Sequence, residues 1–233
     1  MRLFYQPSIL EGQLHLDTDE SRHCIKVLRL KEQDQIEVLD GKGGRHTVSI
    51  SDPNHKKCAF SIVLSKIEPK PLHHIHIAIA PTKNIDRVEW FVEKAVEIGV
   101  QEISFFFSTN SERKHFKTDR VIKKAVSAMK QSHKTFLPII NEPIKLNALI
   151  QKAESNEKYI AFVDHANPDL LFDIAAPFKE TLILIGPEGD FSEKELEIAI
   201  ANGYKKVSLG PSRLRTETAG IAAVHIMNLI NKS

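Results

Sequence analysis

Two Gly/Pro-containing corners in the last third of the chain most constrain its fold. The first follows a short apolar run and reads Ile185-Gly-Pro-Glu-Gly-Asp-Phe-Ser-Glu-Lys-Glu-Leu196, and the second begins about 25 residues later, at Leu209. In each, an apolar run ends at glycine and proline, which interrupt regular structure, and a helical pattern follows. Two such strand–loop–helix corners predict neighbouring loops on one side of an α/β sheet, where open sheets bind small molecules.

The first corner contains the signals of a helix start. Ser192 is a good N-cap, Glu195 completes a capping box, and Phe191 and Leu196 occupy the positions of a hydrophobic staple. Gly203 is placed to end the helix. The free N–H groups at such a helix start favour an anionic ligand group, although a well-capped connection without a ligand has the same spacing. Neither a phosphate P-loop nor a dinucleotide Gly-x-Gly-x-x-Gly fingerprint is present.

The second corner places polar and cationic side chains before a closing apolar helix. It reads Leu209-Gly-Pro-Ser-Arg-Leu-Arg-Thr-Glu-Thr-Ala-Gly220. Thr216 is positioned to cap the helix, and Glu217 is favourable in its first turn. Two arginines, Arg213 and Arg215, together with a glutamate beside an expected cleft suggest a chemical site. A surface ion pair would use the same residues, so the pattern alone leaves both interpretations open.

Both corners resemble motifs of the SPOUT superfamily of knotted RNA methyltransferases, and most closely those of its RsmE-type members. That family carries Gly-Pro-Glu-Gly-Gly-Phe and Leu-Gly-x-Arg-Ile-Leu-Arg-x-Glu-Thr-Ala. The matching segments here are Gly186-Pro-Glu-Gly-Asp-Phe191 and the stretch from Leu209 to Ala219. The resemblance covers nearly the whole chain, through further segments at 22–29, 83–100, 111–113 and 131–134. RsmE-type enzymes methylate N3 of a uridine in small-subunit (16S) ribosomal RNA, and the resemblance implies that activity.

The pattern of apolar runs predicts two units. Residues 1–68 are β-rich, with extended runs at 2–5, 13–16, 35–39, 46–50 and 59–64 and a helical candidate at 21–30. Residues 72–233 alternate strands at 75–80, 102–107, 159–163, 181–185 and 205–209 with helices near 86–98, 118–134, 146–154, 193–202 and 217–231. Alternation of this kind predicts an α/β fold with a mostly parallel sheet covered on both faces. Asp86 is the expected cap of the first of these helices.

The resemblance makes this architecture more specific. It implies that residues 1–68 form a small PUA-like RNA-binding β-barrel, and that residues 72–233 form a SPOUT α/β methyltransferase domain with a C-terminal trefoil knot. It also implies a homodimer with the cofactor site near the subunit boundary. The expected RNA partner is small-subunit ribosomal RNA, either naked or in the assembled small ribosomal subunit.

Positive charge is concentrated in one segment, although the net charge is only +2. Residues 111–134 hold eight Lys/Arg against two acidic residues, which suits a phosphate backbone. A solvated helix face would look the same, and the resemblance favours RNA. The candidate RNA contacts are Arg22, His23, Arg29, Lys83, Arg113, Lys114, Lys117, Lys124 and Lys134. An acidic row at Glu89, Glu93 and Glu97 is either exposed or part of a site or dimer contact.

The resemblance also implies the cofactor and the site residues. S-adenosylmethionine supplies an activated methyl group, so no metal is required. The candidate cofactor-binding residues are Ile185, Gly186, Pro187, Glu188, Gly189, Leu209, Gly210, Ser212, Leu214 and Thr216. Arg215 is the candidate for stabilising the uridine anion, with Glu217 as base or as the residue that orients Arg215.

Departures from the family motifs leave alternatives for the substrate. Asp190 replaces a motif glycine, Ser212-Arg-Leu214 replaces Arg-Ile-Leu, and Gly220 replaces a more usual alanine. A related SPOUT enzyme with another RNA target, or a catalytically silent RNA-binding module, therefore remains as an alternative to the uridine-N3 methyltransferase.

Location and metal binding can also be judged from the sequence. No apolar run is long enough to span a bilayer and the first residues lack the apolar core of a secretory signal, so we expect a cytoplasmic protein. Cys24 and Cys58 lack metal-site spacing and are expected to be free thiols. His74 and His76 share one face of a strand, but without an evident carboxylate or Cys beside them no metal is expected.

Overall fold

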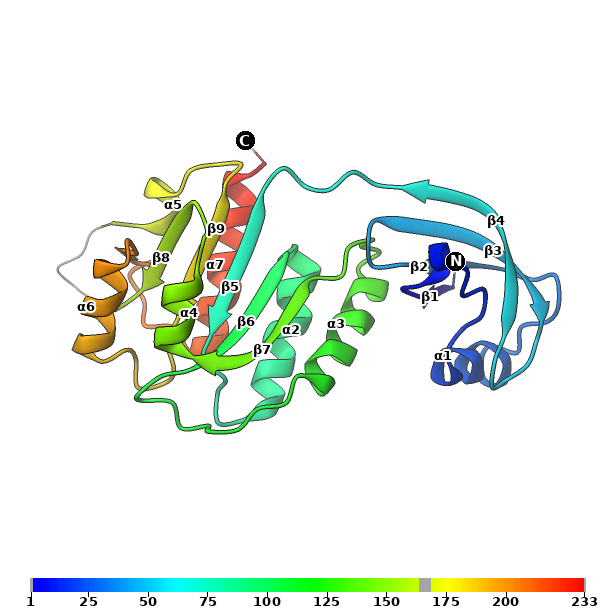
Figure 1. Ribbon diagram of the computed structural model, residues 1–233, viewed down its shortest axis with the longest axis horizontal. Coiled ribbons are helices and arrows are strands. Elements are labelled where there is room, and N and C mark those ends of the chain that lie inside the picture. Colours follow the sequence, from blue (N-terminus) through cyan, green and yellow to red (C-terminus); the bar gives the residue numbers. More distant parts are fainter. Residues whose placement is uncertain (1, 164–168, 233) are drawn as a thin grey trace. The chain divides into compact units, whose positions relative to one another are not determined.

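The computed structural model describes residues 2–163 and 169–232, which form two compact units (Figure 1). The first unit comprises the chain up to Lys70 together with Met129–Leu137, and the second comprises Pro71–Ala128 and the chain from Pro138 onward. Backbone hydrogen bonds join Met129–Leu137 to the first unit: Gly43 N–H donates to Thr135 O (3.1 Å) and Leu137 N–H donates to Gly41 O (2.9 Å). A short excursion from the second part of the chain therefore completes the first unit.

The first unit contains a four-stranded sheet in the order β1–β2–β3–β4. Its strands are β1 (Leu3–Tyr5), β2 (Gln35–Leu39), β3 (Gly44–Asp52) and β4 (Ala59–Ile67). The first pair is parallel and the other two are antiparallel. Buried side chains that include Phe4, Ile36, Val48 and Phe60 form the core. Cys24 and Cys58 are buried in the same core as free thiols, as predicted.

The predictions of a strand at 13–16 and a helix at 21–30 were partly wrong. In 13–16 only His15 forms a bridge, to Ala59. The backbone makes two isolated hydrogen bonds there, from Leu16 N–H to Cys58 O (2.9 Å) and from Phe60 N–H to Leu14 O (3.1 Å), rather than a ladder. The helical segment starts earlier, as α1 (Thr18–Arg22), where Asp17 accepts a capping hydrogen bond from Glu20 N–H (2.8 Å). It continues as the π-helical turn η2 (His23–Val27), and a 3₁₀ turn η1 (Ile9–Glu11) precedes both.

The second unit is a six-stranded, all-parallel sheet in the order β10–β8–β9–β5–β6–β7. Its strands are β5 (His74–Ile79), β6 (Glu102–Phe107), β7 (Ile139–Lys145), β8 (Glu157–Ala161), β9 (Glu180–Ile185) and β10 (Lys205–Val207). Its helices are α2 (Ile85–Ile98), α3 (Asp119–Gln131), α4 (Leu146–Lys152), α5 (Leu171–Ile174), α6 (Glu193–Ala201) and α7 (Thr216–Ile230). The predicted α/β fold with a mostly parallel sheet is confirmed.

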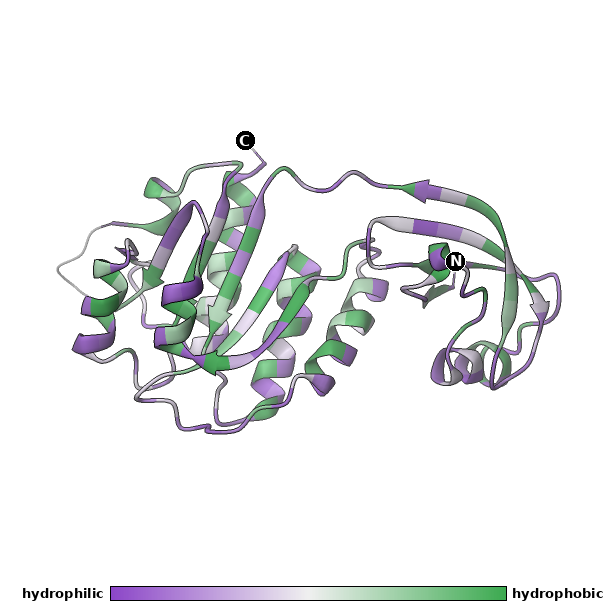
Figure 2. Cartoon of the chain, viewed as in Figure 1, coloured by the Kyte–Doolittle hydropathy of each residue, from purple (hydrophilic) through white to green (hydrophobic). Residues whose placement is uncertain are grey.

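Helices cover both faces of this sheet (Figure 1). Helices α2 and α7 pack on one face, and α4 and α6 pack on the other around a core that includes Leu182, Leu184 and Phe106. Strands β5, β6 and β9 become continuously hydrophobic toward their carboxyl ends (Figure 2), as expected for strands buried on both faces. No helix in the described part of the chain is long and apolar enough to cross a membrane.

The structure confirms one predicted helix cap and corrects two. At α6, Ser192 and Glu195 form the predicted capping box. At α2 the cap is Asn84 rather than Asp86, because Asn84 Oδ1 accepts the hydrogen bond from the Asp86 N–H (2.9 Å). At α7 Thr216 is already helical, and Arg215 takes the extended cap conformation without a side-chain capping bond. The cap prediction for Thr216 was therefore wrong.

Candidate active site

The two corners meet at the carboxyl end of the parallel sheet. The first follows β9 and the second follows β10, and only β8 separates these strands in the sheet. Residues 185–188 of the first corner and 214–216 of the second line one hollow of about 440 Å³. Residues 209–212 line an adjoining hollow of about 710 Å³, which shares Asp190, Arg213 and Leu214 with the first. The structure thus brings together nearly all the predicted cofactor-binding residues.

Gly186 and Gly189 allow close packing at the first corner. A Cβ at Gly186 would lie 3.0 Å from the Phe191 ring, and one at Gly189 would lie 3.2 Å from Asn110 Cβ. The Asn110 amide donates to the carbonyls of Gly189 and Asp190, each at 3.1 Å. Gly189 does not line either hollow within the described residues, so its place is beneath the corner, against the loop that follows β6.

Glu195 attaches the helix after the first corner to the same loop. One carboxylate oxygen accepts hydrogen bonds from the Thr109 N–H (2.8 Å) and hydroxyl (3.0 Å), and the other accepts from the Ser192 N–H (2.9 Å) and hydroxyl (2.8 Å). Burial opposes ionisation, but these hydrogen bonds together hold the pKa of Glu195 below its ordinary value. The carboxylate therefore serves as a charged support for the corner.

Asp190 occupies a position where the RsmE-type motif has glycine, and the backbone conformation at this position explains why glycine is favoured there. Its φ is +58°, in the left-handed region that glycine enters freely and aspartate tolerates. Oδ1 accepts a hydrogen bond from the Phe191 N–H (2.8 Å). Burial raises the pKa of Asp190, while backbone hydrogen bonds from Phe191 and Val163 and the charge of Arg213 lower it. Asp190 thus connects the corner to the segment after β8, in the wall shared by the two hollows.

The structure separates the two predicted catalytic residues. Arg215 is exposed and lines the smaller hollow. Glu217 is buried and does not line it within the described residues, and its Oε1 lies 3.8 Å from Arg87 Nε. The sequence reasoning missed Arg87, which lines the smaller hollow from the first turn of α2. Its position within the family-like segment 83–100 was the available signal.

Some of the predicted RNA contacts already form hydrogen bonds or ion pairs with other residues of the protein, and others do not. Lys114 and Lys117 are exposed and make no ion pair among the described residues. Arg113 instead donates to the carbonyl oxygens of Thr82 (2.9 Å) and Lys83 (2.5 Å), which secures the loop after β5. Lys83 is exposed with Glu112 3.1 Å away. In the first unit Arg22, His23 and Arg29 are exposed and Lys134 is half-buried.

The acidic row of α2 faces basic side chains of α3. Glu89 lies 2.6 Å from Arg120, and Glu93 lies 3.1 Å from Lys124. Glu93 also contacts Lys94 at 2.9 Å. The row is therefore engaged in ion pairs, and it neutralises part of the basic segment, including one predicted RNA contact.

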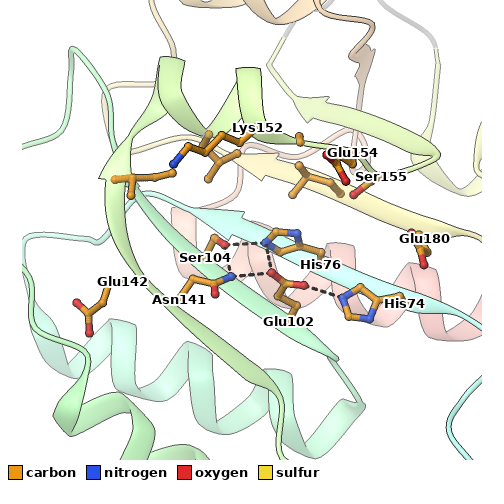
Figure 3. A pocket seen from close by; sticks show the side chains of 14 residues that line it. His74, His76, Glu102, Ser104, Asn141, Glu142, Lys152, Glu154, Ser155 and Glu180 are labelled. Carbon is orange, nitrogen blue, oxygen red and sulfur yellow. Dashed lines mark hydrogen bonds and ion pairs between the residues drawn. The ribbon is translucent and has the colours of Figure 1, made fainter.

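A separate polar pocket lies across β5, β6 and β7 (Figure 3). His74 Nε2 lies 2.8 Å from Glu102 Oε2, His76 Nε2 lies 2.8 Å from Ser104 Oγ, and the Asn141 amide donates to Glu102 (2.6 Å) and Ser104 (2.9 Å). Burial lowers the pKa of His76 to about 4, although Glu102 opposes this. The expectation that no carboxylate lies near these histidines was wrong, because β6 pairs beside β5 and places Glu102 opposite His76. The described residues nevertheless contain no group of three suited to hold a metal ion.

Comparison with known proteins gives matches over both units. A family model described as an RNA methyltransferase domain matches residues 68–228, and one described as an RNA methyltransferase PUA domain matches residues 16–63. Two curated proteins named ribosomal RNA small subunit methyltransferase E are each 30% identical to this chain. The one from Buchnera aphidicola aligns over 96% of this chain and 90% of its own length, and the one from Aquifex aeolicus over 97% and 99%.

Two solved structures are similar over nearly their full length. A probable rRNA-methyltransferase from Porphyromonas gingivalis has a TM-score of 0.92 and 41% identity, covering 100% of this chain and 99% of that one. A ribosomal RNA small subunit methyltransferase E from Neisseria gonorrhoeae, bound to S-adenosyl methionine, has a TM-score of 0.87 and 28% identity, covering 99% and 98%.

Proposed function

The chain belongs to the RNA methyltransferase family of the ribosomal RNA small subunit methyltransferase E type, and from this premise we propose that it methylates N3 of a uridine in small-subunit ribosomal RNA. It is an S-adenosylmethionine-dependent ribosomal RNA methyltransferase. The observation that carries the finer proposal is the meeting of both motif corners, with Arg215, at one hollow beside the sheet.

The residues around the two hollows fit S-adenosylmethionine. Gly210 has a φ of +128°, and a Cβ there would meet no atom within 4 Å, so the backbone borders open space. Ser208 Oγ fixes this turn by accepting from the Gly210 N–H (3.2 Å) and donating to the Gly210 carbonyl (3.1 Å). Main-chain groups of 186–188 and 209–214 would hold the cofactor, which supplies a methyl group already activated on a sulfonium.

Arg215 is suited to the chemistry that uridine N3 demands. The nitrogen carries a weakly acidic hydrogen, so it becomes a good nucleophile only when that proton is lost. A guanidinium in the hollow lowers the free energy of the resulting anion, because a cation already in place compensates the negative charge as it develops. Glu217 is better suited to position a neighbouring cation than to take the proton, since it is buried outside the lining of the hollow. N3 lies on the pairing edge, so the target base must be unpaired or flipped out.

The wider assignments rest on family membership and on the two units. We propose RNA contacts from the PUA-like unit through Arg22, His23 and Arg29, and from the exposed Lys114 and Lys117. The proposal has five further parts. The N-terminal sheet closes in a barrel-like way, the C-terminal loops form a trefoil knot, and the domains span residues 1–68 and 72–233. The protein is a homodimer and its location is cytoplasmic. The bridge between Leu170 and Ser208, which places the chain after β10 beside the segment before α5, supports an intertwined C-terminal region.

The decisive experiment identifies the methylated product. The purified protein is incubated with labelled S-adenosylmethionine and unmethylated small ribosomal subunits, and the RNA is digested to nucleosides. N3-methyluridine is the expected product. Another labelled nucleoside would overturn the N3 assignment. No transfer from a folded protein that binds the cofactor, beside a working control enzyme, would favour a different RNA target, and failure to bind the cofactor would favour a silent RNA-binding module.

A further inference from the structure

We propose that Arg87 is a second catalytic arginine, which Glu217 holds in the hollow so that it shares the uracil anion with Arg215. This inference rests on the proposed function and extends it by a residue on a different helix. Three observations carry it: the position of Arg87 in the hollow, the free donors of its guanidinium, and the burial of Glu217.

Arg87 lines the hollow although it is far from both corners in the sequence. It lies in the first turn of α2, and it lines the same hollow as residues 185–188 and 214–216. Its side chain is 41% exposed. Among the described residues its guanidinium makes an ion pair with Glu217 through Nε but donates no hydrogen bond within 3.5 Å. Its two terminal NH₂ groups are therefore available to a substrate.

Glu217 has the properties of an anchor for this arginine. Its side chain is only 9% exposed, and its Oε2 is buried with no hydrogen-bond partner. A buried carboxylate is costly unless charge compensates it. The first turn of α7 provides part of that compensation through its free N–H groups, and Arg87 provides the only ion pair of Glu217 among the described residues. This arrangement restrains Arg87 at the edge of the hollow.

The packing of α2 against α7 sets the distance between these two side chains. Gly220 lies one turn after Glu217, and a Cβ there would be 2.5 Å from the ring of Phe91, which lies one turn after Arg87. The absence of a side chain at Gly220 therefore lets the helices approach closely next to the ion pair. A second Arg–Glu pair, Arg120 with Glu89, joins α3 to α2 but does not line the hollow within the described residues.

Two guanidinium groups match the charge of a uracil that has lost its N3 proton. The negative charge is delocalised onto O2 and O4, which flank N3 on both sides. One arginine can donate to each carbonyl oxygen and leave the N3 lone pair directed at the methyl group. The proton passes from N3 to solvent water, the N3–C bond then forms as the C–S bond breaks, and the sulfonium becomes a neutral thioether. Arginine suits this position because its guanidinium carries a delocalised positive charge and its N–H donors lie in one plane.

The test uses the acidity of the target base as the readout. Small subunits are reconstituted from RNA transcribed with uridine or with 5-fluorouridine, whose electron-withdrawing fluorine makes N3–H more acidic. Single-turnover methylation is measured from neutral to alkaline pH for the wild type and for Arg87→Gln, Arg87→Lys, Glu217→Gln and the matched control Arg120→Gln. Dissociation constants for S-adenosylmethionine and for subunits, and thermal unfolding, are measured in parallel.

We expect Arg87→Gln to slow methylation of uridine by roughly 10²–10³-fold, the usual loss for one preorganised donor to a developing anion. The loss should be smaller on 5-fluorouridine and should shrink as the pH rises, with both dissociation constants unchanged. Arg87→Lys, which keeps the charge, should retain more activity than Arg87→Gln, and Glu217→Gln should show the same substrate pattern with a smaller loss. Arg120→Gln should behave as the wild type.

Other outcomes overturn the inference. Wild-type rates for Arg87→Gln would show that Arg87 has no role in the reaction. An equal loss on both bases, or weaker binding of the subunit or cofactor, would assign Arg87 to binding rather than to the uracil anion. If Arg87→Gln fails to fold, the inference is tested with Arg87→Lys and Glu217→Gln instead, by comparing their methylation rates on uridine and on 5-fluorouridine. A wild-type product other than N3-methyluridine would instead refute the proposed function itself.

Discussion

Gly220 is where α7 approaches α2 most tightly, and the substitution Gly220→Ala tests that packing. The added Cβ would lie 2.5 and 2.9 Å from two ring atoms of Phe91 and 3.1 Å from Ile79 Cδ1. Phe91 is fully buried, so its ring cannot move aside without displacing other core side chains or leaving the core. Alanine improves the propensity of a helix interior by about 1 kcal/mol, but overpacking a core typically costs about 1–3 kcal/mol. The two terms together leave a net loss of about 0–2 kcal/mol. Because the contacts are this short, we expect the upper half of that range, roughly 1–2 kcal/mol.

Urea unfolding followed by circular dichroism measures this difference, and a second substitution identifies its cause. Phe91→Leu removes the ring atoms in the clash, so Gly220→Ala should cost less in that background, with a favourable coupling of about 1–2 kcal/mol. Thr218→Ala, at an exposed position of the same helix, controls for helix propensity alone. The reasoning is refuted if Gly220→Ala is as stable as the wild type, or if the two substitutions are simply additive.

Three further predictions concern the helix cap, the polar pocket and the basic segment. Ser192→Ala should lower the free energy of unfolding by about 1 kcal/mol, as measured by urea unfolding, because it removes the side chain of a capping box; no loss would contradict the cap. Because His76 has a folded pKa of about 4 against an ordinary 6.5, the unfolded chain gains its proton first as the pH falls, so the wild type should lose up to about 3 kcal/mol between these values. His76→Asn should flatten that dependence in thermal unfolding, and an unchanged pH profile would refute the assignment. Replacing Lys114 and Lys117 with Gln should reduce the salt slope of RNA binding by about 1 for each lysine that touches a phosphate, whereas Lys124→Gln, already paired with Glu93, should change it less; equal slopes for all variants would remove the exposed pair from the interface.

The sequence predicts the second unit well where apolar runs and turn residues agree. β9, with the sequence Glu-Thr-Leu-Ile-Leu-Ile, is a short apolar run between clear turn signals. β7 was missed because its sequence, Ile-Ile-Asn-Glu-Pro-Ile-Lys, contains polar residues and Pro143. It lies at the edge of the sheet, where proline is tolerated because one side of the strand forms no ladder. A local pattern cannot reveal an edge position, since that depends on which strands become neighbours.

The same distinction applies to the candidate site. The lining from 185–188 and 214–216 could be predicted because each motif is contiguous and carries its own turn and helix signals. The ion pair of Arg87 with Glu217 joins two helices 130 residues apart, and nothing local specifies it. The interpretation of the acidic row at Glu89 and Glu93 was likewise open, because the basic partners belong to another helix. An ion pair between two helices depends on how those helices pack against each other, and the pattern of a single sequence does not specify that packing.

Two of the departures from the family motifs, Asp190 and Gly220, are accommodated locally, and this bears on the choice of substrate. The Asp190 carboxylate accepts hydrogen bonds from the backbone of Phe191 and Val163, so it is already engaged by groups of the protein itself. Gly220 removes a methyl group at the position where the Phe91 ring occupies the space. With Asp190 and Gly220 in place, both Arg87 and Arg215 line the hollow. Substitution of Asp190 should therefore change the backbone conformation of the first corner, and any effect on RNA binding should follow from that change.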